Sequence, residues 1–244
     1  MKRIILSILI AMPLAAAAQQ NSTDAGLWLS AEAVKKIDKK WSVFGGAEYR
    51  LQDNFSAPDR WNVEIGARFK PLKWLKLDAG YKLMRDYSLE ETKYKSDGAT
   101  PNKLIPAYWD TRHRFYAAAT GSVKTGNLTF SLREKWQYTY RPSLTVDRYD
   151  VDDEEWETKE VSGKARHVLR SRLEAALTVP QWAVEPYVSA EMYNMKGGLE
   201  KTRYTVGADW KLSKKHAVGA FYRYIDRKED ANSHIIGIGY KYKF

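Results

Sequence analysis

Two pairs of arginines have the residue type and the spacing that bind anions. Arg112 and Arg114 flank His113, and Arg170 and Arg172 form a second pair with the same spacing. Residues two apart on a strand point to the same face, so both guanidinium groups of a pair would act together. A guanidinium holds a phosphate or a carboxylate through two parallel hydrogen bonds. The pairs predict either an anion site or ordinary pairing with neighbouring carboxylates, which is the more common role.

Histidine is the residue that would supply acid–base chemistry, and its placement does not indicate catalysis. The chain has four histidines and no cysteine, which excludes a disulfide, a thiolate metal site and a cysteine nucleophile. Ser233 and His234 form the one adjacent serine–histidine pair, an adjacency that arises readily by chance. The His-x-Ser-Asn motif of membrane-embedded phospholipases does not occur. We therefore expect no enzymatic activity, metal or cofactor, with a lipid-modifying enzyme as the weakest alternative.

Residues 147–160 form a strongly acidic stretch. Eight of its 14 residues are acidic, namely Asp147, Asp150, Asp152, Asp153, Glu154, Glu155, Glu157 and Glu160. The stretch lacks the glycine and the ligand spacing of a calcium-binding EF-hand loop. Because like charges at this density favour disorder, we expect a solvated surface loop, which divalent cations could bridge.

The elements that must position these residues are strands. In residues 61–69 every second residue is apolar, from Trp61 to Phe69, and the residues between them are polar or glycine. A strand separates such residues onto two faces, whereas a helix would mix them. Most of these strands reach the length that a tilted strand needs to cross a membrane. The same reading applies to residues 27–34, 41–51, 75–83, 108–123, 128–140, 167–179, 184–193, 202–212, 216–226 and 234–244.

Short and long connections alternate between these segments. Tight turns are predicted at residues 37–39, 71–73, 124–127, 180–181 and 213–215. Longer polar segments are predicted at residues 53–60, 88–107, 141–166, 194–201 and 227–233. Outer-membrane barrels have short periplasmic turns and longer extracellular loops. The sequence therefore predicts an all-β fold, an antiparallel transmembrane β-barrel of 10–12 strands.

The number of strands leaves one point open. Eleven segments are predicted, whereas two chain ends on the periplasmic side require an even number. Either a twelfth strand lies within a loop, or residues 27–34 lie partly in the lumen.

The start of the chain has the pattern of an export signal. Residues 2–3 are positively charged, residues 4–14 are apolar, and the alanines at 16–18 supply a cleavage site before Gln19. The apolar run has 11 residues, and a membrane-spanning helix needs about 20. We expect residues 1–18 to be a cleaved signal peptide. Residues 19–244 then form a single barrel domain in the bacterial outer membrane.

The end of the chain predicts how the barrel is assembled. Ile236, Ile238, Tyr240, Tyr242 and Phe244 form an alternating apolar face that ends at the last residue. This face looks like the sorting signal that the barrel-assembly machinery reads. We therefore expect Tyr240, Tyr242 and Phe244 to be the assembly signal and that machinery to be a partner.

The aromatic residues gather at the ends of the predicted strands. The chain has 9 tryptophans and 16 tyrosines. Those next to tight turns are Trp41, Trp74, Trp182 and Trp210, and those beside longer segments are Trp61, Trp109, Trp136, Tyr138 and Tyr140. Two such belts are typical of the girdles at the two membrane interfaces, so outer-membrane lipid and lipopolysaccharide are expected partners. In a soluble barrel the aromatic residues would instead gather mid-strand.

The polar faces of the strands would line the lumen. By parity the inward basic residues include Arg68, Arg112, Arg114, Arg170 and Arg172, and carboxylates share the same faces. Opposite charges in a narrow lumen can pair and close it, which favours a structural or surface-interaction role. The alternative is a small passive channel for anionic solutes such as acidic oligosaccharides.

The net charge and the oligomeric state concern possible partners. The net charge of +10 does not indicate nucleic acid as a partner, because the chain carries an export signal and its basic residues alternate with apolar ones. We expect a monomer.

Glu134 breaks the alternation by falling on the apolar face of its strand, which a β-bulge would explain.

Several short motifs resemble a known family of exported barrels, domain of unknown function 2490. They are Gly26-Leu27-Trp28, Lys39-Lys40-Trp41-Ser42, Glu48-Tyr49-Arg50, Asp59-Arg60, Trp74-Leu75-Lys76, Ala79-Gly80-Tyr81 and Arg112-His113-Arg114-Phe115. The resemblance implies an outer-membrane barrel and brings no catalytic residues, since the family has no assigned activity. A looser likeness, in Glu48-Tyr49-Arg50, Asp59-Arg60 and the inward arginines, is to small porins for acidic oligosaccharides.

Overall fold

The computed structural model describes residues 23–228 and 231–244, so the predicted signal peptide, residues 1–18, lies outside the described residues. None of the described residues belongs to a helix long and apolar enough to cross a membrane. The described residues form fifteen strands: β1 (Asp24–Lys36), β2 (Trp41–Gln52), β3 (Ala57–Phe69), β4 (Leu75–Ser88), β5 (Glu91–Tyr94), β6 (Pro101–Ile105), β7 (Tyr108–Thr125), β8 (Leu128–Arg141), β9 (Leu144–Asp150), β10 (Glu155–Val161), β11 (Lys164–Leu177), β12 (Val184–Met195), β13 (Gly198–Lys211), β14 (His216–Arg227) and β15 (Ser233–Lys243).

Eleven of these strands close into one barrel, in the order β1-β15-β14-β13-β12-β11-β8-β7-β4-β3-β2. Each predicted strand corresponds to one of them, and the count lies within the predicted 10–12. Ten of the pairings are antiparallel. The all-β barrel fold is therefore confirmed.

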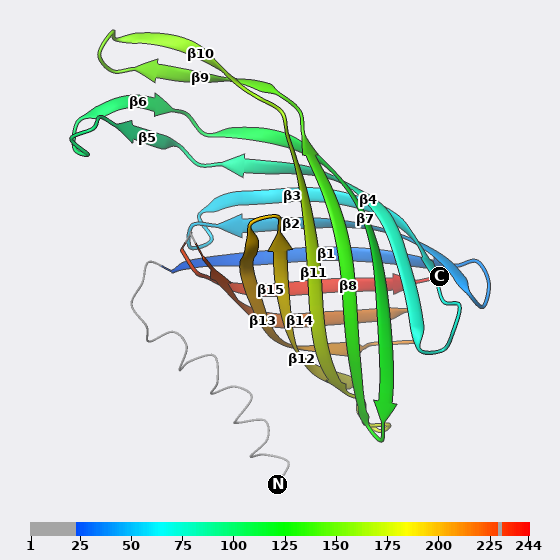
Figure 1. Cartoon of the computed structure of the whole chain (residues 1–244). Helices are drawn as coiled ribbons and strands as arrows, with labels where there is room; N and C mark the ends of the chain where they lie inside the picture. The colour runs from blue at the N-terminus through cyan, green and yellow to red at the C-terminus, as the bar shows by residue number, and fades with distance from the viewer. Residues whose placement is uncertain (1–22, 229–230) are drawn as a thin grey trace.

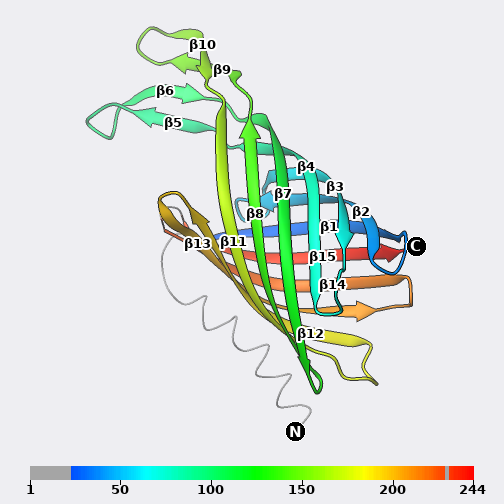
Figure 2. The same cartoon turned by 45° about the vertical axis from the view of Figure 1, so that its right-hand side comes forward.

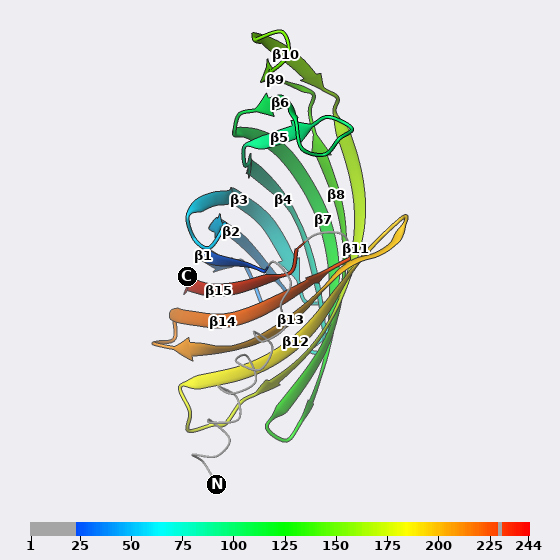
Figure 3. The same cartoon turned by 90° about the vertical axis from the view of Figure 1, so that its left-hand side faces the viewer.

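The eleventh pairing, between β1 and β15, is parallel, so the barrel is not purely antiparallel as expected. Asp24 pairs with Ser233, and Val34 pairs with Lys243. With an odd number of strands the first and last must run in the same direction, and the chain enters and leaves the barrel at opposite ends (Figure 1). Neither explanation offered for the odd count is needed, because β1 is a complete wall strand that also pairs with β2 (Figure 3).

The two ends of the barrel differ in their connections. The turns that follow β1, β3, β7, β11 and β13 lie at one end, which we call the turn end. The opposite end, which we call the loop end, carries the two long connections, from β4 to β7 and from β8 to β11.

Two connections at the loop end are shorter than predicted. Only residues 53–56 separate β2 from β3, and residues 196–197 separate β12 from β13. Asp53, Asn54 and Phe55 have φ angles of 51°, 52° and 71°. Asp and Asn tolerate this left-handed conformation, so the polar composition read as a loop instead forms a tight turn.

The two long connections form a second, four-stranded sheet of order β10-β9-β6-β5 beyond the barrel (Figures 1 and 2). The acidic stretch, expected to be disordered, is the hairpin of β9 and β10. Cross-strand pairs offset the repulsion among its carboxylates. Arg148 forms an ion pair with Glu157, and the rings of Tyr149 and Trp156 lie 5.3 Å apart.

The outer wall of the barrel is apolar, as the alternation predicted. Ile65, Phe115 and Leu173 are exposed on it, with 65%, 50% and 59% of their surface accessible. Tryptophans predicted for the girdles are exposed, including Trp41, Trp61, Trp74, Trp136, Trp182 and Trp210. Trp41, Trp74, Trp182 and Trp210 lie at or beside strand ends, whereas Trp61 and Trp136 lie nearer the middle of β3 and β8. Such a wall would face lipid if the barrel spans a membrane.

Glu134 lies on this outer wall without a β-bulge. Its pairings with Ala119 and Ser171 belong to ladders that have no register shift. The Ser171 hydroxyl donates a hydrogen bond of 2.7 Å to its carboxylate. A neighbouring donor, and not a change of register, therefore accommodates the carboxylate.

The lumen contains two clusters of buried apolar residues. Val34, Phe44 and Tyr116 form the first, which we call the central cluster. Trp28, Ile225 and Ile235 form the second, with Phe221 packed against them. Glycines on the wall make room for the central rings. A Cβ at Gly80 would lie 2.6 Å from the Tyr116 hydroxyl, so a larger residue there would displace the ring.

Candidate functional site

A cavity of about 270 Å³ lies in the lumen at the loop end, and we call it the basic cavity. Its uncharged lining residues are Gln137, Thr139, Val168 and Tyr193. The other ten are basic and none is acidic: Arg50, Arg60, Arg112, Arg114, Arg141, Lys164, Arg166, Arg170, Lys201 and Arg203. A cavity with this lining would hold an anion.

Strand alternation and register bring these side chains next to one another on the inner face of the barrel. Arg112 and Arg114 are two apart on β7 and share the inner face. Tyr193 on β12 pairs with Arg170 on β11 and with Lys201 on β13. The inward residues of these strands therefore lie together in a single part of the lumen.

Part of the positive charge is neutralised within the wall. Asp86 binds the guanidinium groups of both Arg60 and Arg112, the latter at 2.9 Å. Asp110 binds Arg112 at 2.7 Å, and Glu191 binds Arg170 at 2.7 Å. These arginines hold carboxylates in fixed positions. This is the ordinary pairing with neighbouring carboxylates that the sequence left open.

Another part is not neutralised by any carboxylate of the described residues. The Arg114 Nε donates to the Thr139 hydroxyl at 2.8 Å, and an Nη of Arg203 donates to the Tyr193 hydroxyl. Arg141 donates to a backbone carbonyl, that of Ser162, at 2.8 Å. Neutral partners leave the charge of these guanidinium groups available to a ligand.

Aromatic rings hold several of these arginines in place. The guanidinium carbon of Arg50 lies 3.7 Å from the Trp28 ring centroid, and those of Arg203 and Arg223 lie 5.1 and 4.9 Å from it. Arg203 also lies 4.5 Å from the Tyr193 centroid. Cation–π contacts of this kind stabilise a cation without cancelling its charge.

The structure places the five predicted lumen arginines in two groups. Arg112, Arg114 and Arg170 line the basic cavity. Arg68 instead binds Asp78 at 2.7 Å and lies over the Phe44 ring. Arg172 binds Glu174 at 3.3 Å. The last two therefore act as partners of wall carboxylates outside the cavity.

Sequence reasoning missed the aromatic residues of the site. Trp28 has the same parity as Ser30 and Glu32, and Tyr193 has the same parity as Glu191. Both rings therefore had to lie on the inner face, but neither was among the predicted lumen residues. Parity was the signal that would have found them.

A second lumen cavity of about 320 Å³ lies at the turn end and shares no lining residue with the basic cavity. Acids and bases mix in its lining, which includes Glu32, Glu185, Asp209, Lys211, Lys241 and Lys243. The Lys211–Glu185 and Lys241–Glu32 pairs, at 2.7 and 3.2 Å, join them. The excess positive charge is therefore concentrated at the loop end.

The one adjacent serine and histidine do not form a catalytic pair. Ser233 is buried and accepts a hydrogen bond of 2.5 Å from Arg227. His234 shares a hydrogen bond of 2.5 Å with Tyr222. Consecutive strand residues point to opposite faces, so the serine hydroxyl and the imidazole cannot meet.

All four histidines stack beside aromatic rings. His113 shares a 2.7 Å hydrogen bond with Tyr81, and His216 shares one of 2.6 Å with Tyr240. The His167 ring lies 4.9 Å from that of Tyr138. These contacts belong to the aromatic outer wall, and no histidine lines the basic cavity.

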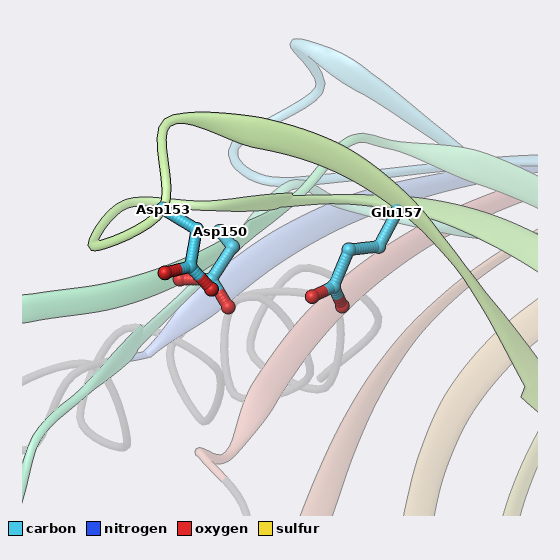
Figure 4. Close-up of side chains that lie close together, drawn as sticks. All are labelled: Asp150, Asp153 and Glu157. Atoms are coloured by element: carbon cyan, nitrogen blue, oxygen red, sulfur yellow. The ribbon is translucent and has the colours of Figure 1, made fainter.

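Asp150, Asp153 and Glu157 form a carboxylate cluster in the β9–β10 hairpin, with ligand atoms within 4.8 Å of one another (Figure 4). Lys103 binds Asp150 and lies 3.8 Å from Glu157. The Lys103 hydrogen bond lowers the pKa of Asp150 below its ordinary value. Lys103 and Arg148, which pairs with Glu157, already offset part of the negative charge. We therefore assign no ion to the cluster, and bridging by divalent cations stays a prediction.

The barrel with its apolar wall and aromatic girdles has the fold of an outer-membrane protein. The translocator domain of the autotransporter NalP from Neisseria meningitidis is 13% identical, with a TM-score of 0.61 over 96% of this chain and 94% of that one. The beta domain of the Bordetella autotransporter Brka is 15% identical, with a TM-score of 0.54 over 82% and 79%. At such identities the likeness concerns the fold alone.

The chain belongs to the family described as "Protein of unknown function (DUF2490)", whose model matches residues 25–235. The resemblance seen in its short motifs is therefore confirmed. A porin, NanC, is 12% identical over 91% of this chain and all of that one, but its TM-score of 0.49 is too low to carry a conclusion. A comparison with curated proteins found no match.

Proposed function

We propose that this protein is an outer-membrane barrel with a closed lumen and a structural or surface-interaction role. The observation that carries the proposal is the central cluster. Val34 and Phe44 belong to the adjacent strands β1 and β2, whereas Tyr116 belongs to β7, three strands further from β2 around the barrel. Tyr116 therefore reaches past β4 and β3, and the three side chains fill the lumen along this side of the barrel.

Polar contacts reinforce this closure. The Tyr116 hydroxyl donates to Glu64 on β3, and the Lys135 ammonium lies 3.4 Å from the Tyr116 ring centroid. Lys82 binds Glu64 at 2.9 Å. Paired charges and packed rings are what a lumen closed to hydrated ions would contain. The proposal places the loop end outside the cell, because long loops are extracellular in such barrels.

The remaining features of the proposal come from the sequence. A signal peptide of residues 1–18 would direct export, and the assembly machinery would recognise Tyr240, Tyr242 and Phe244. The girdles would contact lipid and lipopolysaccharide, and the barrel would be a monomer without catalytic activity. The position of His234 and Ser233 on opposite faces of β15 supports the last point.

A second candidate function is a small passive channel for anionic solutes such as acidic oligosaccharides. The basic cavity favours it, because a positive lumen attracts anions. The central cluster speaks against it, because its three side chains occupy lumen space that a passage would need.

Planar-bilayer recording of the purified wild-type protein tests the proposal. A closed lumen predicts no steady conductance at any applied voltage that the bilayer withstands. A steady, anion-selective conductance would favour the channel instead. Identical migration of boiled and unboiled protein on gels would argue against a closed barrel of any kind.

A further inference from the structure

The basic cavity holds more positive charge than its wall neutralises. Ten basic side chains line it, and five carboxylates form ion pairs with them: Glu48, Asp86, Asp110, Glu191 and Glu200. Among the described residues, no carboxylate lies within ion-pair distance of Arg114, Arg141, Lys164 or Arg203. Concentrating unpaired charge in a partly enclosed space is unfavourable unless an anion occupies it.

Hydrogen-bonding capacity is also unused. The Nε atoms of Arg141, Arg170 and Arg203 are buried and have no hydrogen-bond partner in the described part of the chain. A buried donor without a partner costs free energy, and ordered water or a ligand can supply the missing acceptor. All three atoms belong to residues that line one cavity. Because the Nε atoms themselves are buried, a ligand in the cavity would meet the terminal nitrogens of these guanidinium groups.

The arginines are fixed before any ligand arrives. Arg203 lies between the Trp28 and Tyr193 rings, at 5.1 and 4.5 Å from their centroids. Thr139 holds the Nε of Arg114. Rings and hydroxyls orient the guanidinium groups without neutralising them, which lowers the entropic cost of binding an oxyanion.

We propose that the basic cavity binds a soluble, multiply charged oxyanion, such as a phosphorylated solute, chiefly through Arg114 and Arg203. The guanidinium fork matches the geometry of phosphate oxygens. The cavity lies inside the wall, so its ligand comes from solution and is not the phosphate of a surrounding lipid. This inference deepens the proposed surface-interaction role and rests on it for the direction in which the cavity faces.

Isothermal titration of the full-length mature barrel, folded in uncharged detergent, tests this site with pyrophosphate as the probe. Wild-type protein should bind pyrophosphate more tightly than acetate at equal ionic strength. Arg114→Gln and Arg203→Gln should each weaken binding about tenfold or more, the usual loss for a hydrogen bond to a charged group. Arg68→Gln is the matched control, because Arg68 is a lumen arginine outside the cavity that is paired with Asp78. It should change the affinity less than about twofold.

Three results would overturn the site. They are no binding of pyrophosphate by the wild type, equal weakening by all three variants, and binding of lipopolysaccharide micelles without binding of pyrophosphate. Heat-modifiable migration on gels shows which variants are folded, and Arg114→Lys keeps the charge where the glutamine variant fails to fold. Failure here would leave the closed barrel intact, because conductance and pyrophosphate binding are measured independently.

Discussion

Glu191 is the residue on which the order of the inner wall most depends. It is 5% exposed and accepts hydrogen bonds of 2.7 Å from both Arg133 and Arg170. The Tyr193 hydroxyl donates a third, of 3.1 Å. A single carboxylate thus joins β8, β11 and β12. It also orients the Tyr193 ring, which the Arg203 guanidinium group contacts.

Glu191→Ala should therefore lower the free energy of unfolding by about 3–5 kcal/mol, because two buried guanidinium groups lose their counter-ion. Urea unfolding in detergent micelles, followed by gel migration, measures the change. Glu174→Ala is the control, since the Glu174–Arg172 pair is about one quarter exposed on each side and should cost less than about 1 kcal/mol. Equal losses for the two variants would contradict this role for Glu191.

Asp97, in the β5–β6 turn outside the barrel, makes a prediction about pH. The Thr100 hydroxyl and the amides of Thr100 and Ala99 donate to its carboxylate and lower its pKa from 3.8 to about 2. Its folded pKa is depressed, so its contribution to the turn is present above pH 3.8 and is lost as the pH falls through 2. NMR titration of Asp97 should give a midpoint near 2. A midpoint near 3.8, or exchange of the Thr100 amide unaffected by Asp97→Asn, would show that these bonds do not form.

At the scale of elements, β15 closes the barrel. It pairs with β14 on one side and with β1 on the other, and the Phe244 amide donates to the Val34 carbonyl at 2.9 Å. Replacing Tyr242 and Phe244 with glutamate would put charge on the outer face of this strand. We expect at least about a tenfold loss of assembled protein, as charges on the lipid face are strongly unfavourable.

Quantification of heat-modifiable protein in membrane fractions measures this loss. Lys243→Glu changes the charge of the residue between the two, which lies on the other face of the strand, and should leave assembly near wild-type levels. Normal membrane levels of the double variant would show that Tyr242 and Phe244 are not an assembly signal.

The wall strands could be predicted from the sequence because each has one apolar face. Strands β5, β6, β9 and β10 could not, because they are short and contain few apolar residues, and cross-strand pairs such as Arg148–Glu157 stabilise them. The parallel pairing of β1 with β15 follows from the eleven predicted segments if the barrel is closed. It was missed because both chain ends were expected on the periplasmic side, which requires an even number of strands.

The site was predictable only in part. Parity turned Arg112, Arg114 and Arg170 inward, and all three line the basic cavity. Parity could not separate them from Arg172, which pairs with Glu174 two residues along its strand. Position along the barrel axis depends on strand tilt and register, and those come from the closed sheet as a whole.

On the scale of the whole molecule, charge and packing divide the lumen. Unneutralised arginines lie at the loop end, mixed charges lie at the turn end, and two clusters of buried apolar residues fill other parts of the lumen. The two cavities share no lining residue. Under the proposed function, such a lumen would present a basic surface to one side without opening a path to the other.

The most direct test of this account compares wild-type protein with the double variant Phe44→Ala and Tyr116→Ala in planar bilayers. The wild type should show no steady conductance, and the variant should show steady, anion-selective steps, because removing both rings would empty the part of the lumen beside β2 and β7. Phe115→Ala is the control, since this neighbour of Tyr116 is exposed on the outer wall, and it should stay silent. Steady conductance through the wild type, or silence of a correctly folded double variant, would contradict closure by the central cluster.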